Sequence, residues 1–241
     1  MIEPKDYVVI DLEMTGLSPK QHKVIEIGAI RVRGGKEVAS LQLLVNPKCV
    51  IPEKVVALTG ITDAMVAEGI EEDVAMIQLL EFIGEDILVG HNLVFDYSFL
   101  KQWEINHKIK KERKGCDTLK IARALLPVEQ SKKLEELSAF FGIYHQRGHR
   151  ALDDARATGL LLERLKELAF DDEKSRKLFE EKPLIYHAKK QTPATVRQIE
   201  RLRNYCAMHK IEDPICYETL TRSEASRLMD RYLAKYEGSI S

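Results

Sequence analysis

The sequence has little of what marks membrane and secreted proteins. Its 241 residues contain no apolar run near the about 18 residues that a membrane-spanning helix needs, so we expect no membrane segment. The first residues, MIEPKDYVVI, lack a basic stretch followed by a long apolar one, so we expect no secretory signal. Cysteine is scarce and no CxxC pair occurs, which favours reduced thiols in the cytoplasm over disulfides or a zinc site: Cys49, Cys116, Cys206 and Cys216.

An excess of charge of either sign is also lacking. Lys and Arg total 37, Asp and Glu total 38, and the formal net charge is −1. This balance argues against a protein that coats nucleic acid through bulk charge, but it allows one that grips a strand locally. Hydrophobic residues make up 44% and charged residues 31%, which is typical of a globular protein with a buried core.

The order of apolar segments predicts an α/β fold with a mixed sheet. Three β-branched segments come first, and Gly34-Gly35 is typical of a hairpin turn between the last two. The pattern then becomes helical around one short strand. The predicted strands are 7–12, 24–33, 37–45 and 87–91, and the predicted helices are 71–84, 95–106, 117–126, 133–142 and 151–169. The apolar face predicted for the last helix comprises Leu152, Ala155, Leu160, Leu162 and Leu165.

The composition changes after residue 170, which indicates a second unit. We predict a first domain at 1–170, a charged linker at 171–190 and a small helical module at 191–241. About 50 residues are too few for a robust independent domain. The signals for its helices are a start at Thr192-Pro193, a capping box of Thr221 with Glu224, and a stop at Gly238.

Two carboxylates lie at the end of the first predicted strand. Asp11 and Glu13 are two residues apart, so in a strand their side chains project to the same face. Such a pair costs free energy through mutual repulsion when it is buried. A strand that simply runs out into solvent would also explain it, because the string DxE is common.

Three further chemistry-bearing residues occur in two later blocks. Asp96 follows the short strand and lies early in a helix, where the helix dipole alone could favour an acid. His149 follows Gly148 at the start of the last helix, and Asp154 comes five positions later. Asp153 and Asp154 are about 100° apart around a helix, so only one of them can easily face the same side as the histidine.

Together these blocks resemble the three motifs of the DEDDh (DnaQ-like) 3′–5′ exonuclease superfamily. The matching strings are Asp11-x-Glu13, HNxxFD ending at Asp96, and His149-x4-Asp154, and the resemblance covers roughly residues 5–168. The segment 46–66 also looks like one found in proofreading exonucleases of bacterial replicative DNA polymerases. The resemblance implies a ribonuclease H-like fold, a mixed five-stranded sheet flanked by helices, here followed by the small C-terminal helical module.

The resemblance also implies a two-metal phosphodiester hydrolase. Asp11, Glu13, Asp96 and Asp154 would hold two Mg²⁺ or Mn²⁺ ions, because these hard cations prefer oxygen ligands. His149 would be the general base that takes a proton from the attacking water, since an imidazole pKa near about 6.5 suits that task. Family spacing selects Asp154 and leaves Asp153 as its neighbour facing solvent. The product would be a nucleoside 5′-monophosphate.

Two short segments are expected to contact the terminal nucleotide. In the family, backbone NH groups and an apolar side chain after the first motif meet this nucleotide. An ordinary turn, and core packing for the phenylalanine, would explain the same residues without a ligand. The predicted substrate-binding residues are Met14, Thr15, Gly16, Leu17, His91, Asn92 and Phe95.

The motifs leave the substrate open. The string DLEMTGL resembles oligoribonucleases, whereas the segment 46–66 resembles the DNA proofreading branch. We expect a DNA 3′–5′ exonuclease acting on single-stranded or frayed ends, with an RNA exonuclease or oligoribonuclease as the alternative and a non-catalytic nucleic-acid-binding module as an alternative of another class. A DNA polymerase or another replication or repair protein is a possible partner, and the mildly basic C-terminal module could bind DNA or that partner.

Overall fold

The computed structural model describes residues 3–145, 150–187, 192–211, 215, 217 and 220–236. The chain divides into two units, Met1–Tyr186 and His187–Ser241, and each is treated by itself. Within the described ranges, no helix is long and apolar enough to cross a membrane.

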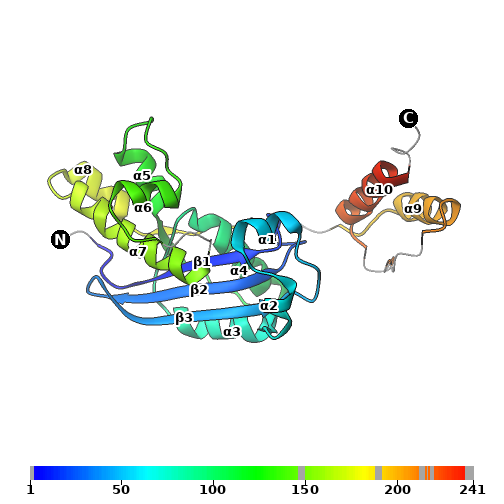
Figure 1. The fold of residues 1–241 in the computed structure, drawn as a ribbon, viewed down its shortest axis with the longest axis horizontal. Coiled ribbons are helices and arrows are strands. Elements are labelled where there is room, and N and C mark those ends of the chain that lie inside the picture. Colours follow the sequence, from blue (N-terminus) through cyan, green and yellow to red (C-terminus); the bar gives the residue numbers. More distant parts are fainter. Residues whose placement is uncertain are drawn as a thin grey trace. The chain divides into compact units, whose positions relative to one another are not determined.

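A mixed sheet forms the centre of the first unit (Figure 1). The β-branched segments at the start form an antiparallel meander of β1 (Tyr7–Met14), β2 (Val24–Arg33) and β3 (Lys36–Asn46). On the other side of β1, β5 (Leu88–Gly90) and β6 (Lys114–Asp117) run parallel to it. The predicted α/β fold with a mixed sheet is confirmed.

Two two-residue strands extend the five main strands at the edges. β4 (Ile70–Glu71) pairs with β3, and β7 (Lys182–Pro183) pairs with β6, so the order is β4-β3-β2-β1-β5-β6-β7. The sequence did not locate β6, because KGCD is short and contains a glycine and a lysine, both poor strand signals.

Alternation along β1 divides the core into two layers. Val8, Ile10 and Leu12 pack with α3 and α4 on one face, whereas Tyr7 and Val9 pack with α5, α6 and α7 on the other. The helices are α1 (Glu53–Thr59), α2 (Asp63–Ala67), α3 (Glu72–Ile83), α4 (Leu93–Asn106), α5 (Thr118–Leu125), α6 (Leu134–Phe140) and α7 (Ala151–Leu168).

The apolar face of α7 differs from the prediction at one position. Leu160 was expected to be buried but is 53% exposed, whereas Leu161 is fully buried. Each helical residue turns by about 100°, which carries Leu160 to the side opposite Leu162 and Leu165. The prediction for Leu160 was therefore wrong, because it counted apolar residues without following the phase of the helix.

The segment expected to be a charged linker packs against the sheet. It contains α8 (Glu173–Arg176), the 3₁₀ helix η1 (Lys177–Phe179) and the edge strand β7. The Phe179 side chain is 1% exposed in the core beside α7, and the Tyr186 hydroxyl donates to Gln102 Oε1 over 3.0 Å. The first unit thus extends beyond the boundary at 170, because a few apolar side chains among many charges are enough to anchor the segment.

Within its described residues, the second unit contains two helices with their own small core. α9 (Val196–Met208) begins at a capping box of Thr195 and Gln198, later than the start expected at Thr192-Pro193, because Pro193 forms an isolated bridge with Thr221. Before α10 (Arg222–Tyr236), Thr221 and Glu224 exchange hydrogen bonds as the sequence predicts. The predicted stop at Gly238 lies outside the described residues. The buried side chains of this core are Leu202, Tyr205, Cys206, Leu220, Ala225, Met229 and Tyr232.

Candidate active site

Two acids stand at the end of β1 on the face covered by α7. Asp11 and Glu13 continue the alternation that begins with Tyr7 and Val9, so their side chains leave the sheet on that face. On the adjacent strand β2, Asp11 lies opposite Gly28, and Glu13 lies opposite another acid, Glu26. The same-face geometry expected from the sequence is therefore present.

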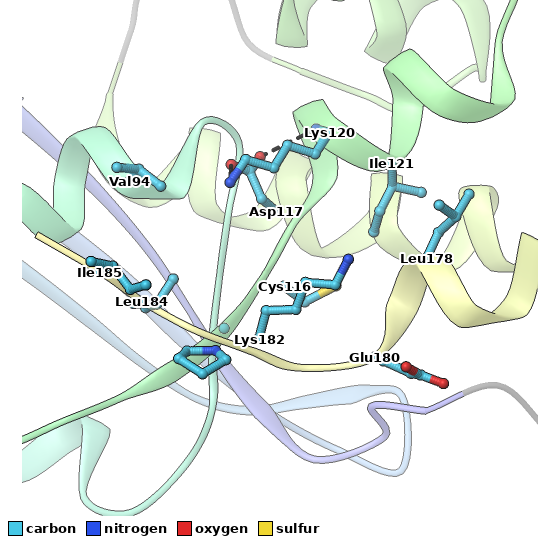
Figure 2. A pocket seen from close by; sticks show the side chains of 12 residues that line it. Val94, Cys116, Asp117, Lys120, Ile121, Leu178, Glu180, Lys182, Leu184 and Ile185 are labelled. Carbon is cyan, nitrogen blue, oxygen red and sulfur yellow. Dashed lines mark hydrogen bonds and ion pairs between the residues drawn. The ribbon is translucent and has the colours of Figure 1, made fainter.

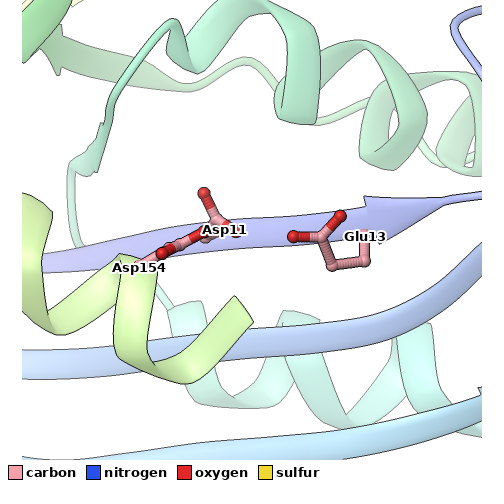
Figure 3. Close-up of side chains that lie close together, drawn as sticks. All are labelled: Asp11, Glu13 and Asp154. Carbon is pink, nitrogen blue, oxygen red and sulfur yellow. The ribbon is translucent and has the colours of Figure 1, made fainter. Parts of the chain in front are cut away.

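Helix α7 brings a third carboxylate to this pair (Figure 3). One carboxylate oxygen each of Asp11, Glu13 and Asp154 lie within 4.8 Å of one another. The Asp154 residue is 5% exposed, whereas the Asp153 side chain is 38% exposed and lies 4.0 Å from Arg156. The helical phase thus turns Asp154, and not its neighbour, toward the two acids of β1.

Asp96 reaches β1 from the opposite side of the sheet. It lies in the first turn of α4, is 5% exposed, and its Oδ1 accepts a hydrogen bond of 3.0 Å from the Leu12 backbone N–H. Strand β5 ends at Gly90, so the Asp96 carboxylate takes the place of a strand partner for Leu12. This hydrogen bond attaches the first turn of α4 to the residue that lies between Asp11 and Glu13 in the chain.

The start of α4 is fixed by a further buried acid. Asn92 precedes the helix with a backbone φ of 71° and donates its N–H to Asp117 Oδ1 over 3.1 Å. The same Asp117 oxygen caps α5 by accepting from the Leu119 N–H over 3.0 Å. Asp117 thus joins the ends of β5 and β6 to the helices that follow them.

Burial and mutual repulsion raise the pKa values of three of these acids. Burial, followed by the charges of Asp96, Asp154 and Glu13, raises the pKa of Asp11 well above its usual range. Burial and neighbouring acids also raise the pKa of Glu13 to about 8 and that of Asp96 to about 7. Acids so close together favour either a retained proton or a bound cation.

This donor set fits divalent cations of the magnesium type. It consists of carboxylate oxygens gathered at one point, which suits Mg²⁺ or Mn²⁺ better than zinc. The described residues include no lysine or arginine that forms an ion pair with Asp11, Glu13 or Asp96, although the charge of Arg150 acts on Glu13. Asp96 lies outside the group of three oxygens but beside it, as its hydrogen bond to Leu12 requires.

A histidine that the sequence analysis did not select contacts the site. The His145 ring Nε2 forms a short hydrogen bond with Asp154 Oδ1, and the His145 side chain is only 10% exposed. The predicted His149 lies outside the described residues, as do its neighbours 146–148. His145 carried no motif signal, because it stands four positions before the motif histidine.

The predicted substrate loop has one prominently exposed side chain. Met14 and Thr15 are 7% and 5% exposed, and the Thr15 N–H donates to the Lys23 carbonyl over 2.8 Å. Gly16 lies against the His22 ring, where an added Cβ would come within 2.4 Å of Cδ2. Leu17 is 80% exposed. The structure therefore leaves Leu17 available for contact, whereas Met14 belongs to the core.

The residues predicted around Asn92 occupy different environments. The two ring nitrogens of His91 lie 2.9 Å from Thr118 Oγ1 and 2.8 Å from the Lys132 carbonyl oxygen. Burial lowers the pKa of His91, which favours a neutral ring joining α5 to the loop before α6. Asn92 is exposed, and Phe95 is half-buried with its ring edge-on to Phe99. His91 is thus engaged within the protein.

A cavity lies beside the end of β6, and Asp117 is one of its lining residues (Figure 2). It has a volume of about 270 Å³ and is closed on one side by the segment 178–185. Asp117 Oδ2 is buried there with no hydrogen-bond partner among the described residues, and Lys120 Nζ lies 3.9 Å away. Most other lining residues are apolar, including Val94, Ile121, Leu178, Leu184 and Ile185.

Comparison with known proteins identifies the family. The family model described as "Exonuclease" matches residues 8–162. The chain is 37% identical over 166 residues to a DNA polymerase III subunit epsilon of Aquifex aeolicus, covering 68% of this chain and 82% of the relative. It is 39% identical over 157 residues to a DNA polymerase III PolC-type protein of Clostridium perfringens, covering 65% of this chain but only 11% of that relative.

Solved structures give the same result. An exonuclease X, determined in complex with 5′ overhanging duplex DNA, is 25% identical with a TM-score of 0.54, covering 72% of this chain and 99% of its own. The nuclease domain of 3′hExo, a DEDDh family member bound to rAMP, shares the fold at 19% identity with a TM-score of 0.56, covering 68% of this chain and 92% of its own. The resemblance that the motifs suggested is confirmed, and the chain belongs to the exonuclease family that includes these DNA polymerase III relatives.

Proposed function

We propose that this protein is a 3′–5′ exonuclease that hydrolyses single-stranded or frayed DNA ends and releases 5′-mononucleotides, in proofreading or repair. The observation that carries the proposal is the group of carboxylates from β1 and α7, with Asp96 beside it. The relatives named above as components of DNA polymerase III support DNA as the substrate and a polymerase as a partner.

Divalent metal ions are part of the proposal. Asp11, Glu13, Asp96 and Asp154 would hold two Mg²⁺ or Mn²⁺ ions, and the raised pKa values of three of these acids support such a role. When bound, the ions would supply an activated water and stabilise charge on the scissile phosphate and the leaving 3′ oxygen.

The remaining steps fall to side chains of the chain itself. His149 would take the proton of the attacking water, as its position in the third motif suggests. The exposed Leu17 side chain would pack against the terminal nucleotide, and Asn92 and Phe95 would border it. His91, whose ring nitrogens both lie within hydrogen-bonding distance of protein groups, would act by holding the loop after α5 in place.

A direct assay tests this function. A 5′-labelled DNA oligomer, an RNA oligomer of the same sequence and a dinucleotide are incubated with Mg²⁺, with and without EDTA. Stepwise shortening of DNA from its 3′ end, abolished by EDTA, is expected. A preference for the RNA dinucleotide would favour the oligoribonuclease alternative, and binding without cleavage of any substrate would favour the non-catalytic one.

The second unit is proposed to support DNA or partner binding. Arg197 and Arg201 are exposed on α9, away from the buried face that contains Leu202. The double substitution Arg197→Gln/Arg201→Gln is expected to raise the KM for a long single strand a few-fold, because each lost phosphate contact weakens binding. The KM for a dinucleotide serves as the control and should not change. If the double variant and the wild type have equal KM values for the long strand, the second unit does not have this role.

A further inference from the structure

The start of α7 is held against β2 by one buried acid. Glu26 is fully buried, and Arg150, which directly precedes α7, donates from Nε to its two oxygens over 3.1 and 3.2 Å and from Nη2 over 2.7 Å. The backbone N–H of Ala151, the first residue of the helix, donates to Glu26 Oε2 over 3.0 Å. Gln42 on β3 donates to Oε1 over 3.0 Å.

These contacts replace a cap that α7 lacks. The N-cap residue Arg150 makes no side-chain cap hydrogen bond, so the first helical N–H would have no partner within its own turn. Glu26 supplies that partner from another element of the fold. A carboxylate on a helix N-terminus also interacts favourably with the helix dipole.

Backbone contact adds to this attachment at the next inward-facing position of β2. A Cβ on Gly28 would lie 2.1 Å from the Ala151 carbonyl carbon, so the helix start rests directly on the strand. Glu26 and Gly28 are the cross-strand partners of Glu13 and Asp11. The same two rungs of the sheet therefore carry both the acids of β1 and the attachment of α7.

We infer that Glu26 is a positioning residue that sets the distance of Asp154 from Asp11 and Glu13 by anchoring the start of α7. This inference rests on the proposed function. Asp154 follows Ala151 by one turn, and its N–H donates to the Arg150 carbonyl over 3.0 Å. A shift of the helix start would therefore move the third carboxylate of the group away from the other two.

A matched pair on the same helix provides the control. Arg156 donates from Nε to both oxygens of Glu37 on β3 over 3.3 and 3.2 Å and from Nη2 over 3.0 Å. Its geometry resembles that of the Glu26 pair, but Glu37 is 36% exposed at its side chain, whereas Glu26 is 0% exposed. An exposed pair of this kind contributes little to stability.

The experiment compares Glu26→Gln with Glu37→Gln in the full chain. Mn²⁺ affinity is measured by calorimetry, and kcat and KM are measured on a DNA oligomer. Glu26→Gln is expected to lower both Mn²⁺ affinity and kcat by about tenfold or more, with KM within about twofold, as is typical of groups that orient metal ligands. Glu37→Gln is expected to leave all three values unchanged.

Unchanged Mn²⁺ affinity in folded Glu26→Gln would overturn the inference. Should that variant fail to fold, Arg150→Lys is measured, because lysine keeps the charge but loses the two-pronged contact. A folded Arg150→Lys protein with wild-type affinity and kcat would be equally decisive. Absence of Mn²⁺ binding or DNA cleavage in the wild type would instead overturn the proposed function, and the positioning role with it.

Discussion

The two ends of helix α4 contain buried acids with opposite surroundings. Glu104 near its end is fully buried and lies 2.9 Å from Arg113 Nη1 and 3.2 Å from Lys101 Nζ. Asp96 in its first turn is almost as buried, but it accepts a backbone hydrogen bond and lies among other acids, and its pKa is raised to about 7. One helix therefore holds one acid that is neutralised by protein cations and one acid that lies among other acids.

This contrast separates structural acids from site acids more sharply than burial does. Glu26 belongs with Glu104, because Arg150 neutralises it, although it stands beside the site. Asp11 and Glu13 belong with Asp96. A buried ion pair is destabilising to break but not necessarily stabilising to have, whereas acids gathered at one point repel one another and favour either a retained proton or a bound cation.

Removing one carboxylate of the group formed by Asp11, Glu13 and Asp154 should have the largest effect, and this effect should be a loss of activity. Asp11→Asn is expected to lower kcat/KM on DNA by at least about 100-fold, because the proposed function makes Asp11 a direct metal ligand, and such a ligand matters more than the groups that orient it. Asp153→Asn is the matched control, since this acid lies on the exposed side of the same helix turn as Asp154. Full activity of Asp11→Asn would contradict the site.

Removing the neutralised acid Glu104 near the end of α4 should instead lower the stability of the protein. Glu104→Gln is expected to lower the free energy of unfolding by about 3 kcal/mol, because the buried Arg113 and the half-buried Lys101 would lose their charged partner. Asp96→Asn should keep or increase stability at pH 8, since it removes a buried charge among like charges. Urea unfolding followed by circular dichroism measures the free energy of unfolding of both variants. Equal losses of stability in the two variants would contradict the contrast between the two ends of α4.

The metal-free site should make stability depend on pH. In the folded protein the pKa of Glu13 is raised to about 8 and that of Asp96 to about 7. In the unfolded chain both pKa values are near about 4, so the folded protein holds these protons to higher pH. The free energy of unfolding should therefore fall as pH rises from about 4 to about 8 in EDTA. Mn²⁺ at 100 times its Kd should restore about 2.7 kcal/mol at pH 8 and less at pH 5.5, where protons compete.

Thermal melting with and without Mn²⁺ measures this difference. Asp11→Asn serves as the control, because it should reduce the metal-dependent shift while the melting of the EDTA form persists. A shift of the same size at both pH values would show that the acids do not bind the ion.

The smallest effect is expected from removing one of the two cations that neutralise Glu104. Lys101→Met leaves Arg113 beside Glu104 and should cost about 1 kcal/mol, clearly less than Glu104→Gln. Urea unfolding of the two variants under identical conditions makes the comparison. A loss as large as that of Glu104→Gln would show that Arg113 alone does not neutralise the buried acid.

Local sequence pattern predicted most elements of the fold. The meander, the hairpin at Gly34-Gly35 and the amphipathic helices follow from periodicity and turn residues. The strand β6 escaped prediction because its four residues have little strand preference and are held by β5 on one side and β7 on the other. The packing of 171–186 was missed because its charges dominate the composition while Phe179 does the anchoring.

In the candidate site, too, local pattern predicted some residues and missed others. Periodicity alone placed Asp11 and Glu13 on one face, and helical phase allowed only one of Asp153 and Asp154 to join them. Glu26 carried no signal, because an acid in a β-branched strand is expected to face solvent until a distant arginine is known to reach it. His145 was passed over for a similar reason, since its contact with Asp154 exists only in the folded protein.

The sequence by itself determined the kinds of elements, the face on which the β1 acids project and the family. These depend on residues close together in the chain and on motifs of fixed spacing. Only the tertiary structure decided which buried acids meet a cation. That outcome depends on distant partners, such as Arg150 for Glu26 and Arg113 for Glu104, and on strand β5 ending early enough for Asp96 to reach Leu12. Charge neutralisation is a property of three-dimensional neighbours, and no local pattern encodes it.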